Sequence, residues 1–331
     1  MGKLRFQVQD CQYLFEVDQT LEIMQTKVKE MGKLSVRHSP SKLPPFPNVV
    51  SIDRNNSYSK LNKSTLSLRG KRAEVVKTFD ARAHDDINDS WYTGAAFLAD
   101  GRLLLVDRQN KKIKLFAKNY RLLNSMDFAS KPWDVDIISS TEVAVTLPEE
   151  RAIQILNVDD VNFSLGDYFI TSEACFGIKF VRGKFFTLAY DEFPPSLIIL
   201  DSNGKELASV AYDDDGSQLF SRPIYMKGSL IYVADERRGS VTTLIETAEH
   251  CYSYSSVELG HAAELALNNE ENQYICRNHT KSVQVGGDRV KTLISHDMIS
   301  YPRAIAFDVN GERLLITQGD KSEVKIFQLV L

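Results

Sequence analysis

The sequence FLADGRLLLVDRQNKKIKLF, residues 97–116, returns near the other end of the chain as FDVNGERLLITQGDKSEVKIF, residues 307–327. Each copy has an aromatic residue, an Asp-Gly or Asn-Gly turn, an apolar run, a charged turn and a short alternating stretch. Asp-Gly and Asn-Gly supply the positive φ angles that tight β-hairpins need. Both stretches therefore predict the same unit of antiparallel strands.

Four looser copies of this unit lie between the two, at residues 134–156, 177–200, 223–245 and 262–285. The second apolar run marks each repeat, at positions Leu103, Val143, Phe185, Leu230, Tyr274 and Leu314. The steps between these markers are 40, 42, 45, 44 and 40 residues. A period of about 40 residues with four strands per unit is typical of a β-propeller. A solenoid is the alternative, but no helical pattern occurs inside the units. We therefore predict an all-β, six-bladed β-propeller over residues 73–331.

A propeller needs a strand that joins its last blade to its first. The last unit ends in VKIFQLVL, residues 324–331, and is one strand short. The run AEVVKTFDARA, residues 73–83, has the pattern of a strand but no repeat unit of its own. We predict that the two runs pair and complete the sixth blade.

Two further regions precede the propeller. In residues 1–32 an apolar seam at spacings of three and four residues predicts a short α-helix closed by Gly32; the seam is Leu14, Val17, Leu21, Met24, Val28 and Met31. This helix would either dock on the following domain or end a longer coiled coil that pairs two copies of the chain. Residues 33–72 hold closely spaced prolines and nine Lys and Arg against one acidic residue, which predicts a basic, extended linker.

Composition and motifs restrict the function classes. Residues 73–331 hold 27 Lys and Arg against 38 Asp and Glu, which disfavours RNA as a ligand because an acidic surface repels phosphate. No apolar stretch reaches membrane length and no signal-peptide pattern occurs, so we expect a cytoplasmic protein with no membrane partner. The four cysteines are scattered, and no catalytic motif is present.

A metal-dependent propeller hydrolase is the enzymatic alternative, because such enzymes project metal ligands into the central channel. Only His261, of the six histidines, stands where an innermost strand begins, whereas a channel metal needs three or more ligands. The acidic runs 86–90 and 213–215 lack the ligand spacing of a calcium loop. We therefore expect no metal and no cofactor.

The innermost strands of a propeller all start on the same face, so the residues before them gather around one mouth of the channel. In this chain those segments read SWYTG, KPWDV, ACFGI, SRPIY, LGHAA and YPRAI. Trp91 and Tyr92 belong to this group, and the candidate partner-binding residues are Trp133, Phe176, Arg222, His261, Tyr301 and Arg303. Arg and aromatic residues are enriched in interface hot spots. Packing between blades is an equal alternative for Trp133 and Phe176. The favoured ligand is a peptide with acidic and apolar groups.

The order of several motifs resembles a known family. GKLSVRHSP after a heptad pattern, then GAAFLADGRLLLVD, KPWDVDI and YPRAIAFD, is similar to the C-terminal part of invertebrate tripartite-motif proteins. That resemblance implies an NHL-type six-bladed propeller that selects the partner or substrate in a ubiquitin-ligase context. The chain departs from the family in lacking the clustered Cys and His of RING and B-box zinc sites. Catalysis by this chain alone is therefore not expected.

Overall fold

A computed structural model of the protein describes most of residues 72–330. The described stretches are 72–191, 194–213, 216–220, 223–227, 231–244, 250–255, 262–269, 272–286, 291–319 and 321–330, with four short N-terminal strands. Contacts divide the chain into two units, Met1–Leu66 and Ser67–Leu331.

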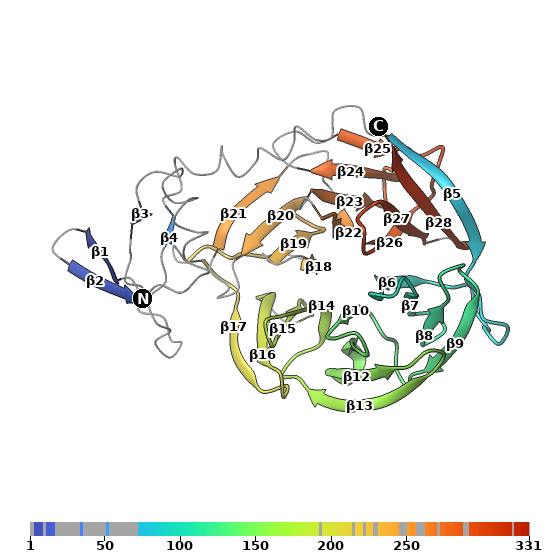
Figure 1. The fold of residues 1–331 in the computed structure, drawn as a ribbon, viewed down its shortest axis with the longest axis horizontal. Helices are drawn as coiled ribbons and strands as arrows, with labels where there is room; N and C mark the ends of the chain where they lie inside the picture. The colour runs from blue at the N-terminus through green and yellow to red at the C-terminus, as the bar shows by residue number, and fades with distance from the viewer. Residues whose placement is uncertain are drawn as a thin grey trace. The chain divides into compact units, whose positions relative to one another are not determined.

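The strands of the second unit pair into six four-stranded sheets among the residues described, one sheet for each sequence repeat. All pairings within these sheets are antiparallel, and the first strand of each sheet lies nearest the centre (Figure 1). We refer to the sheets as blades 1 to 6 in the order of their innermost strands. The predicted β-propeller is confirmed, and the chain forms a ring instead of a solenoid.

Blades 1 to 3 follow one another without interruption in the chain. Blade 1 consists of β6 (Tyr92–Phe97), β7 (Leu103–Asp107), β8 (Lys112–Phe116) and β9 (Leu122–Asp127). Blade 2 consists of β10 (Val135–Ile137), β11 (Glu142–Leu147), β12 (Ala152–Val158) and β13 (Phe163–Ile170), with the 3-10 turn η2 (Pro148–Glu150). Blade 3 consists of β14 (Cys175–Val181), β15 (Lys184–Ala189), β16 (Ser196–Asp201) and β17 (Glu206–Val210).

Blades 4 to 6 complete the ring. Blade 4 consists of β18 (Pro223–Lys227), β19 (Ile231–Asp235), β20 (Ser240–Leu244) and β21 (His250–Ser255). Blade 5 consists of β22 (Ala262–Leu267), β23 (Gln273–Arg277), β24 (Ser282–Gly286) and β25 (Lys291–Ile294). Blade 6 consists of β26 (Pro302–Phe307), β27 (Arg313–Gln318), β28 (Lys321–Val330) and β5 (Arg72–Asp80).

Blade 6 closes the ring with a strand from the other end of the chain. β5 pairs antiparallel with β28, from Glu323 opposite Asp80 to Val330 opposite Arg72 (Figure 1). The predicted pairing of residues 73–83 with the C-terminal strand is therefore confirmed. Since β5 leads directly into blade 1, this pairing links the first and last blades by main-chain hydrogen bonds.

The two repeated turns quoted above have the backbone that their sequences predict. Gly101 and Gly311 have φ angles of 88° and 70°. Their amides donate to the carbonyls of Leu98 and Asp308, at 2.8 and 2.9 Å. Glycine accepts this left-handed backbone without the steric cost that a Cβ brings.

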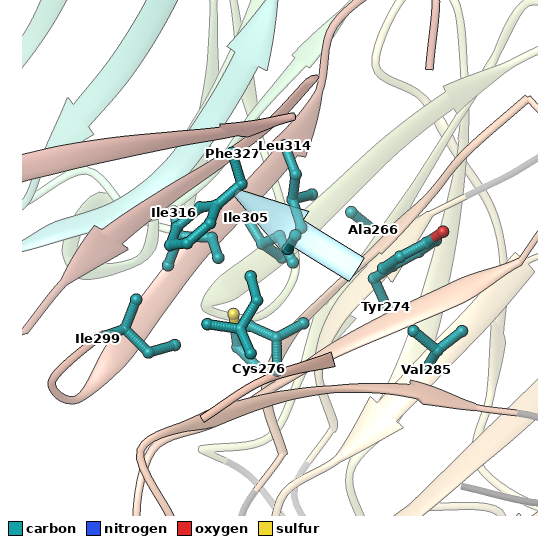
Figure 2. Close-up of a cluster of buried hydrophobic side chains, with 12 residues drawn as sticks. Ala266, Tyr274, Cys276, Val285, Ile299, Ile305, Leu314, Ile316 and Phe327 are labelled. Carbon is teal, nitrogen blue, oxygen red and sulfur yellow. The ribbon is translucent and has the colours of Figure 1, made fainter. Parts of the chain in front are cut away.

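The core consists of apolar clusters between neighbouring blades. Six buried clusters each combine residues of two successive blades, including one that joins blade 6 to blade 1. Figure 2 shows the cluster between blades 5 and 6, where Tyr274 and Cys276 face Ile305 and Leu314. A single sheet cannot bury both of its faces, so this packing stabilises every blade through its neighbours.

Two acidic side chains link innermost strands across blade boundaries. Asp134 Oδ2 accepts from the amide of Ile178 at 3.1 Å, and Glu264 Oε2 accepts from the amide of Ile305 at 2.8 Å. A Cβ on Gly94 would lie 2.9 Å from Asp134 Oδ1, so glycine leaves the space that this carboxylate occupies. These contacts tie blade 2 to blade 3 and blade 5 to blade 6 at their innermost strands.

The N-terminal unit differs from the predicted helix where the structure describes it. β1 (Lys3–Val8) and β2 (Cys11–Glu16) form an antiparallel hairpin, and β3 (Leu34–Ser35) pairs with β4 (Ser51–Ile52). The helix prediction is therefore wrong for residues 3–8 and 11–16, and the rest of its seam, from Val17 on, lies outside the described residues. The reason is the strict alternation of polar and apolar residues in KLRFQV, a period of two that favours a strand, and the pairing of CQYLFE with it.

None of the helices among the described residues is long and apolar enough to cross a membrane. In the part of the propeller that the structure describes, one short 3-10 turn occurs and the remaining regular elements are strands.

Candidate partner-binding site at the channel mouth

A row of aromatic and arginine side chains follows the face where the innermost strands begin. We call this row the aromatic arc; its residues are Trp91, Arg108, Trp133, Phe176, Tyr190 and Arg303. They come from blades 6, 1, 2 and 3, either just before or within an innermost strand or directly after a second strand. The arc therefore spans four successive blades.

Cations and indoles alternate along the first half of the arc. The guanidinium carbon of Arg303 lies 4.8 Å from the ring centre of Trp91. That of Arg108 lies 5.1 Å from the Trp91 ring centre and 5.3 Å from that of Trp133. A guanidinium at this distance is attracted by the ring quadrupole, which contributes about 0.5–2 kcal/mol depending on desolvation.

The second half of the arc is purely aromatic. The rings of Trp133 and Phe176 meet edge to face, with centres 5.1 Å apart and planes at 88°. The rings of Phe176 and Tyr190 are stacked, with centres 3.9 Å apart. Trp133 is 9% exposed and Phe176 is 6% exposed, so both pack between blades 2 and 3 as the alternative interpretation held. Tyr190 is half-buried and reaches the surface beside them.

The arginines of the arc stand apart from the carboxylates of the described residues. Neither Arg108 nor Arg303 forms an ion pair with a carboxylate within the described part of the chain. Arg303 Nε and the indole Nε1 atoms of Trp91 and Trp133 are buried, and among the described residues they meet no hydrogen-bond acceptor. Both arginine residues as a whole are half-buried. A guanidinium offers forked donors that match a carboxylate, so the arc is suited to an anionic group.

A buried carboxylate fixes the backbone of Trp91. Asp107 Oδ1, at the end of β7, accepts from the amide of Trp91 at 3.1 Å. The amide of Arg108 donates to the carbonyl of Trp91 at 2.9 Å. Trp91 and Arg108, which form a cation–indole contact, are therefore both held where β6 begins and β7 ends.

Asp107 itself belongs to a buried ionic cluster around Lys114. The Lys114 ammonium, which is fully buried, lies 2.5 Å from Asp86 Oδ2 and 2.8 Å from Asp107 Oδ2. It also donates to the hydroxyl of Tyr92 and the carbonyl of Ala81, both at 3.3 Å. The cluster thus ties the segment between β5 and β6 to blade 1. Asp86, from the acidic run 86–90, forms an ion pair with Lys114.

The ionisation of this cluster follows from its surroundings. Burial alone would raise the pKa of Asp107, but the charge and hydrogen bond of Lys114, with donors from Asn110 and Trp91, lower it overall. Burial raises the pKa of Tyr92 far above its ordinary value, so its hydroxyl stays protonated and donates to the carbonyl of Ala81 at 2.7 Å.

Thr146 performs a comparable role for Trp133 and Phe176. Its hydroxyl donates to the carbonyl of Phe176 at 2.6 Å and accepts from the amide of Asp134 at 3.0 Å. Its carbonyl accepts from the amide of Trp133 at 3.0 Å. One residue on β11, through its hydroxyl and its carbonyl, therefore sets the relative position of two arc residues from different blades.

The other predicted mouth residues have mixed outcomes. Tyr301 is 41% exposed, and the Lys281 ammonium lies 4.3 Å from its ring centre, so it stands at the mouth but outside the arc. Arg222 and His261 lie outside the described residues. Tyr92 was expected at the mouth, yet it is fully buried between blades 6 and 1. Successive side chains of an extended chain point to opposite sides, so Tyr92 and Trp91 point to opposite sides.

Arg108 and Tyr190 are arc residues that the sequence analysis missed. Both follow a second strand directly, in VDRQ and LAYD, whereas the predicted mouth residues all stand before or at the start of innermost strands. In an antiparallel pair the second strand ends on the face where the first strand begins. The residue after each second strand therefore also lies at the mouth. Position after the strand was the signal that could have identified them.

A cavity of about 260 Å³ lies at the opposite ends of the innermost strands, beside the two repeated turns of blades 1 and 6. Its walls carry both signs of charge, and two of its acids are engaged as turn caps. Asp100 bonds to Arg102, and Asp308 accepts from the amides of Glu312 and Arg313. Among the described residues, no three His, Cys, Asp or Glu side chains converge as metal ligands.

Comparisons with known proteins identify the fold and no family. No protein-family model and no curated protein matches the chain. A streptogramin B lyase structure is similar with a TM-score of 0.57 and 11% identity, covering 77% of this chain and 98% of the other. Virginiamycin B lyase from Staphylococcus aureus gives 0.57 and 9%, covering 78% and 100%. A protein of unknown function from Bacteroides thetaiotaomicron gives 0.62 and 9%, covering 79% and 76%. At these identities the likeness concerns the propeller fold alone.

Proposed function

We propose that this chain is a protein- or peptide-binding propeller module that recognises its partner at the channel mouth. The observation that carries the proposal is the pair of half-buried arginines, Arg108 and Arg303, which flank Trp91 and form no ion pair with a carboxylate of the described residues. Aromatic and arginine side chains are the residues that dominate binding energy in protein interfaces. A half-buried guanidinium beside an indole loses part of its hydration, which costs free energy. A carboxylate of a binding partner would offset this cost with hydrogen bonds.

The resemblance to tripartite-motif proteins supports a particular cellular context. An NHL-like propeller of six blades would serve as the substrate- or partner-recognition part of a ubiquitin-ligase-like protein. The six sequence repeats and the closing strand β5 are compatible with that architecture. In that family, zinc-binding domains with clustered Cys and His recruit the ubiquitin chemistry. The Cys and His residues of the sequence given are scattered. The role of this chain is therefore recognition.

Two other functions of propellers have less support. An RNA-binding propeller would need a continuous basic surface that tracks phosphates. The 27 basic and 38 acidic residues of the region 73–331 oppose such a surface. The similarity to lyases raises the enzymatic alternative, but at 9–11% identity it carries no site residues.

A peptide selection tests the recognition function. The full chain, immobilised, would be exposed to a phage-displayed library of random peptides, with the R108Q/R303Q double variant as the control surface. We expect a consensus that is enriched on the wild-type chain and lost on the variant. Enrichment of no peptide above an unrelated propeller would contradict the proposal, and a consensus retained on the variant would place recognition outside the arc.

A further inference from the structure

The arc contains every tryptophan of the chain, and it places both next to one arginine. Trp91 and Trp133 are the two tryptophans of the sequence, and the Arg108 guanidinium contacts both rings. Trp91 additionally carries Arg303 at 4.8 Å. Two guanidinium groups are therefore held close to a single indole, at fixed positions on rigid strand ends.

This arrangement restricts the chemistry of the ligand. Two neighbouring cations that pair with no acid in the described part of the propeller favour a ligand with two anionic groups a short distance apart. The aromatic half of the arc, which ends at the half-buried Tyr190, favours an apolar group farther along the same ligand. Nucleic acid fits less well, because repeated phosphates would approach an otherwise acidic propeller.

An extended peptide meets these requirements with a simple pattern. Side chains at positions i, i+2 and i+4 of an extended strand point to the same side and lie about 7 Å apart. Carboxylates at i and i+2 would reach Arg303 and Arg108, and an aromatic side chain at i+4 would reach Trp133 and Tyr190. The order along the ligand follows the order of the groups along the arc.

We propose that the aromatic arc binds an extended acidic segment of a partner protein, with the pattern acidic–x–acidic–x–aromatic in either chain direction. This inference rests on the proposed recognition function and specifies its ligand. Arg108 and Arg303 each hold one carboxylate, and Trp91 positions both guanidinium groups. Asp107, which accepts the Trp91 amide at 3.1 Å, is a positioning residue of the site.

Intrinsic fluorescence tests the inference on the full chain, because both fluorescent indoles belong to the arc. The probes are the synthetic peptides Ser-Glu-Ser-Glu-Ser-Phe-Ser and its reverse, with Ser-Gln-Ser-Gln-Ser-Phe-Ser as the uncharged control. We expect a saturable change in emission with one acidic peptide and at least about tenfold weaker binding of the control, since the control lacks both charged hydrogen bonds to the arginines.

Variants separate the site from general charge effects. R108Q/R303Q should lose at least about tenfold in affinity for the acidic peptide, whereas R121Q, which removes an exposed arginine of blade 1, should leave it unchanged. If the double variant melts far below the wild type, R108K and R303K replace it, because lysine keeps the charge and loses the fork.

Several results would overturn the inference. Equal binding of the glutamine peptide, or full affinity in R108Q/R303Q, would show that the arginines hold no carboxylates. Tighter binding of a uridine octamer than of the acidic peptides would assign the arc to nucleic acid. If the phage selection enriches peptides without an acidic pair, recognition stands but this ligand class is wrong; if it enriches none, the recognition function itself fails.

Discussion

Lys114 and its two buried carboxylates are the residues on which the geometry of the mouth depends. The ammonium, Asp86 and Asp107 are almost completely excluded from solvent. Removing the cation leaves two uncompensated carboxylates, and the loss of one partner from a buried pair costs about 3–5 kcal/mol. We predict that K114M lowers the free energy of unfolding by an amount in this range, measured by denaturant titration at neutral pH.

K112M is the matched control for this prediction. The Lys112 ammonium also forms two ion pairs, to Asp85 at 2.7 Å and Asp127 at 3.0 Å, but both carboxylates are exposed. Such pairs contribute about 1 kcal/mol or less. Equal losses for K112M and K114M would show that burial of the cluster has no special weight.

The same cluster predicts a dependence on pH. The pKa of Asp107 is lowered in the folded protein, so its contribution to stability is fully present above the ordinary value of 3.8. That contribution is lost as the pH falls below 3.8 through the depressed pKa. We therefore expect the stability difference between wild type and K114M to narrow in this acidic range, measured by chemical unfolding at several pH values. A difference that widens in acid would contradict the sign.

At the scale of single residues, the sequence predicted that the site consists of Arg and aromatic residues, but it did not predict all of the residues that belong to the arc. Trp133 and Arg303 were placed at the mouth because they precede or begin innermost strands, and both belong to the arc. Arg108 was missed because its position depends on where β7 ends relative to β6, which is a pairing between strands. Lys114 was missed because an interior lysine on a strand carries no sequence signal of its buried partners.

At the scale of elements, β5 is the strand that the ring needs most. Its side chains are largely exposed, including Val75 at 42% and Val76 at 53%, so its contribution lies mainly in main-chain pairing with β28. Without it, the edge of β28 is unpaired and blade 6 loses its link to blade 1. We predict that deleting residues 73–80 from the full chain lowers the melting temperature by at least about 5 °C, as a loss of several kcal/mol would.

The control is a deletion of equal length, residues 55–62, in the predicted linker. It should leave the melting temperature of the propeller unchanged in a calorimetric scan. An unaltered midpoint in the chain without residues 73–80 would mean that the ring holds together without its closing strand.

The elements also show where a local pattern misleads. The N-terminal seam has helical spacing from Leu14 onward, yet Cys11–Glu16 pairs with Lys3–Val8 as a hairpin. The helical spacing of apolar residues from Leu14 on competes there with the strict alternation of polar and apolar residues in Lys3–Val8. Within the blades no such conflict occurs, since turn residues, apolar runs and the period of the repeat all favour the same strands.

At the scale of the whole molecule, the repeat period was enough to predict a closed ring and its closing strand. Each blade buries its faces only against its neighbours, so a repeated pattern with an unpaired strand at each end must join them. Which face binds a partner follows from the pairing of the strands, and the chemistry of that face follows from contacts between blades. Period and composition do not encode those contacts.

The central claim is that a positively charged, aromatic mouth exists on a chain of formal net charge −4. Quenching of tryptophan emission by iodide and by caesium tests it most directly, with each quenching constant divided by that of free N-acetyltryptophanamide. An anion should be concentrated at the arc and a cation depleted, so we expect a normalised iodide constant at least about twofold the caesium constant at low salt. R108Q/R303Q should bring the two together. Equal constants in the wild type, or a larger one for caesium, would contradict the account.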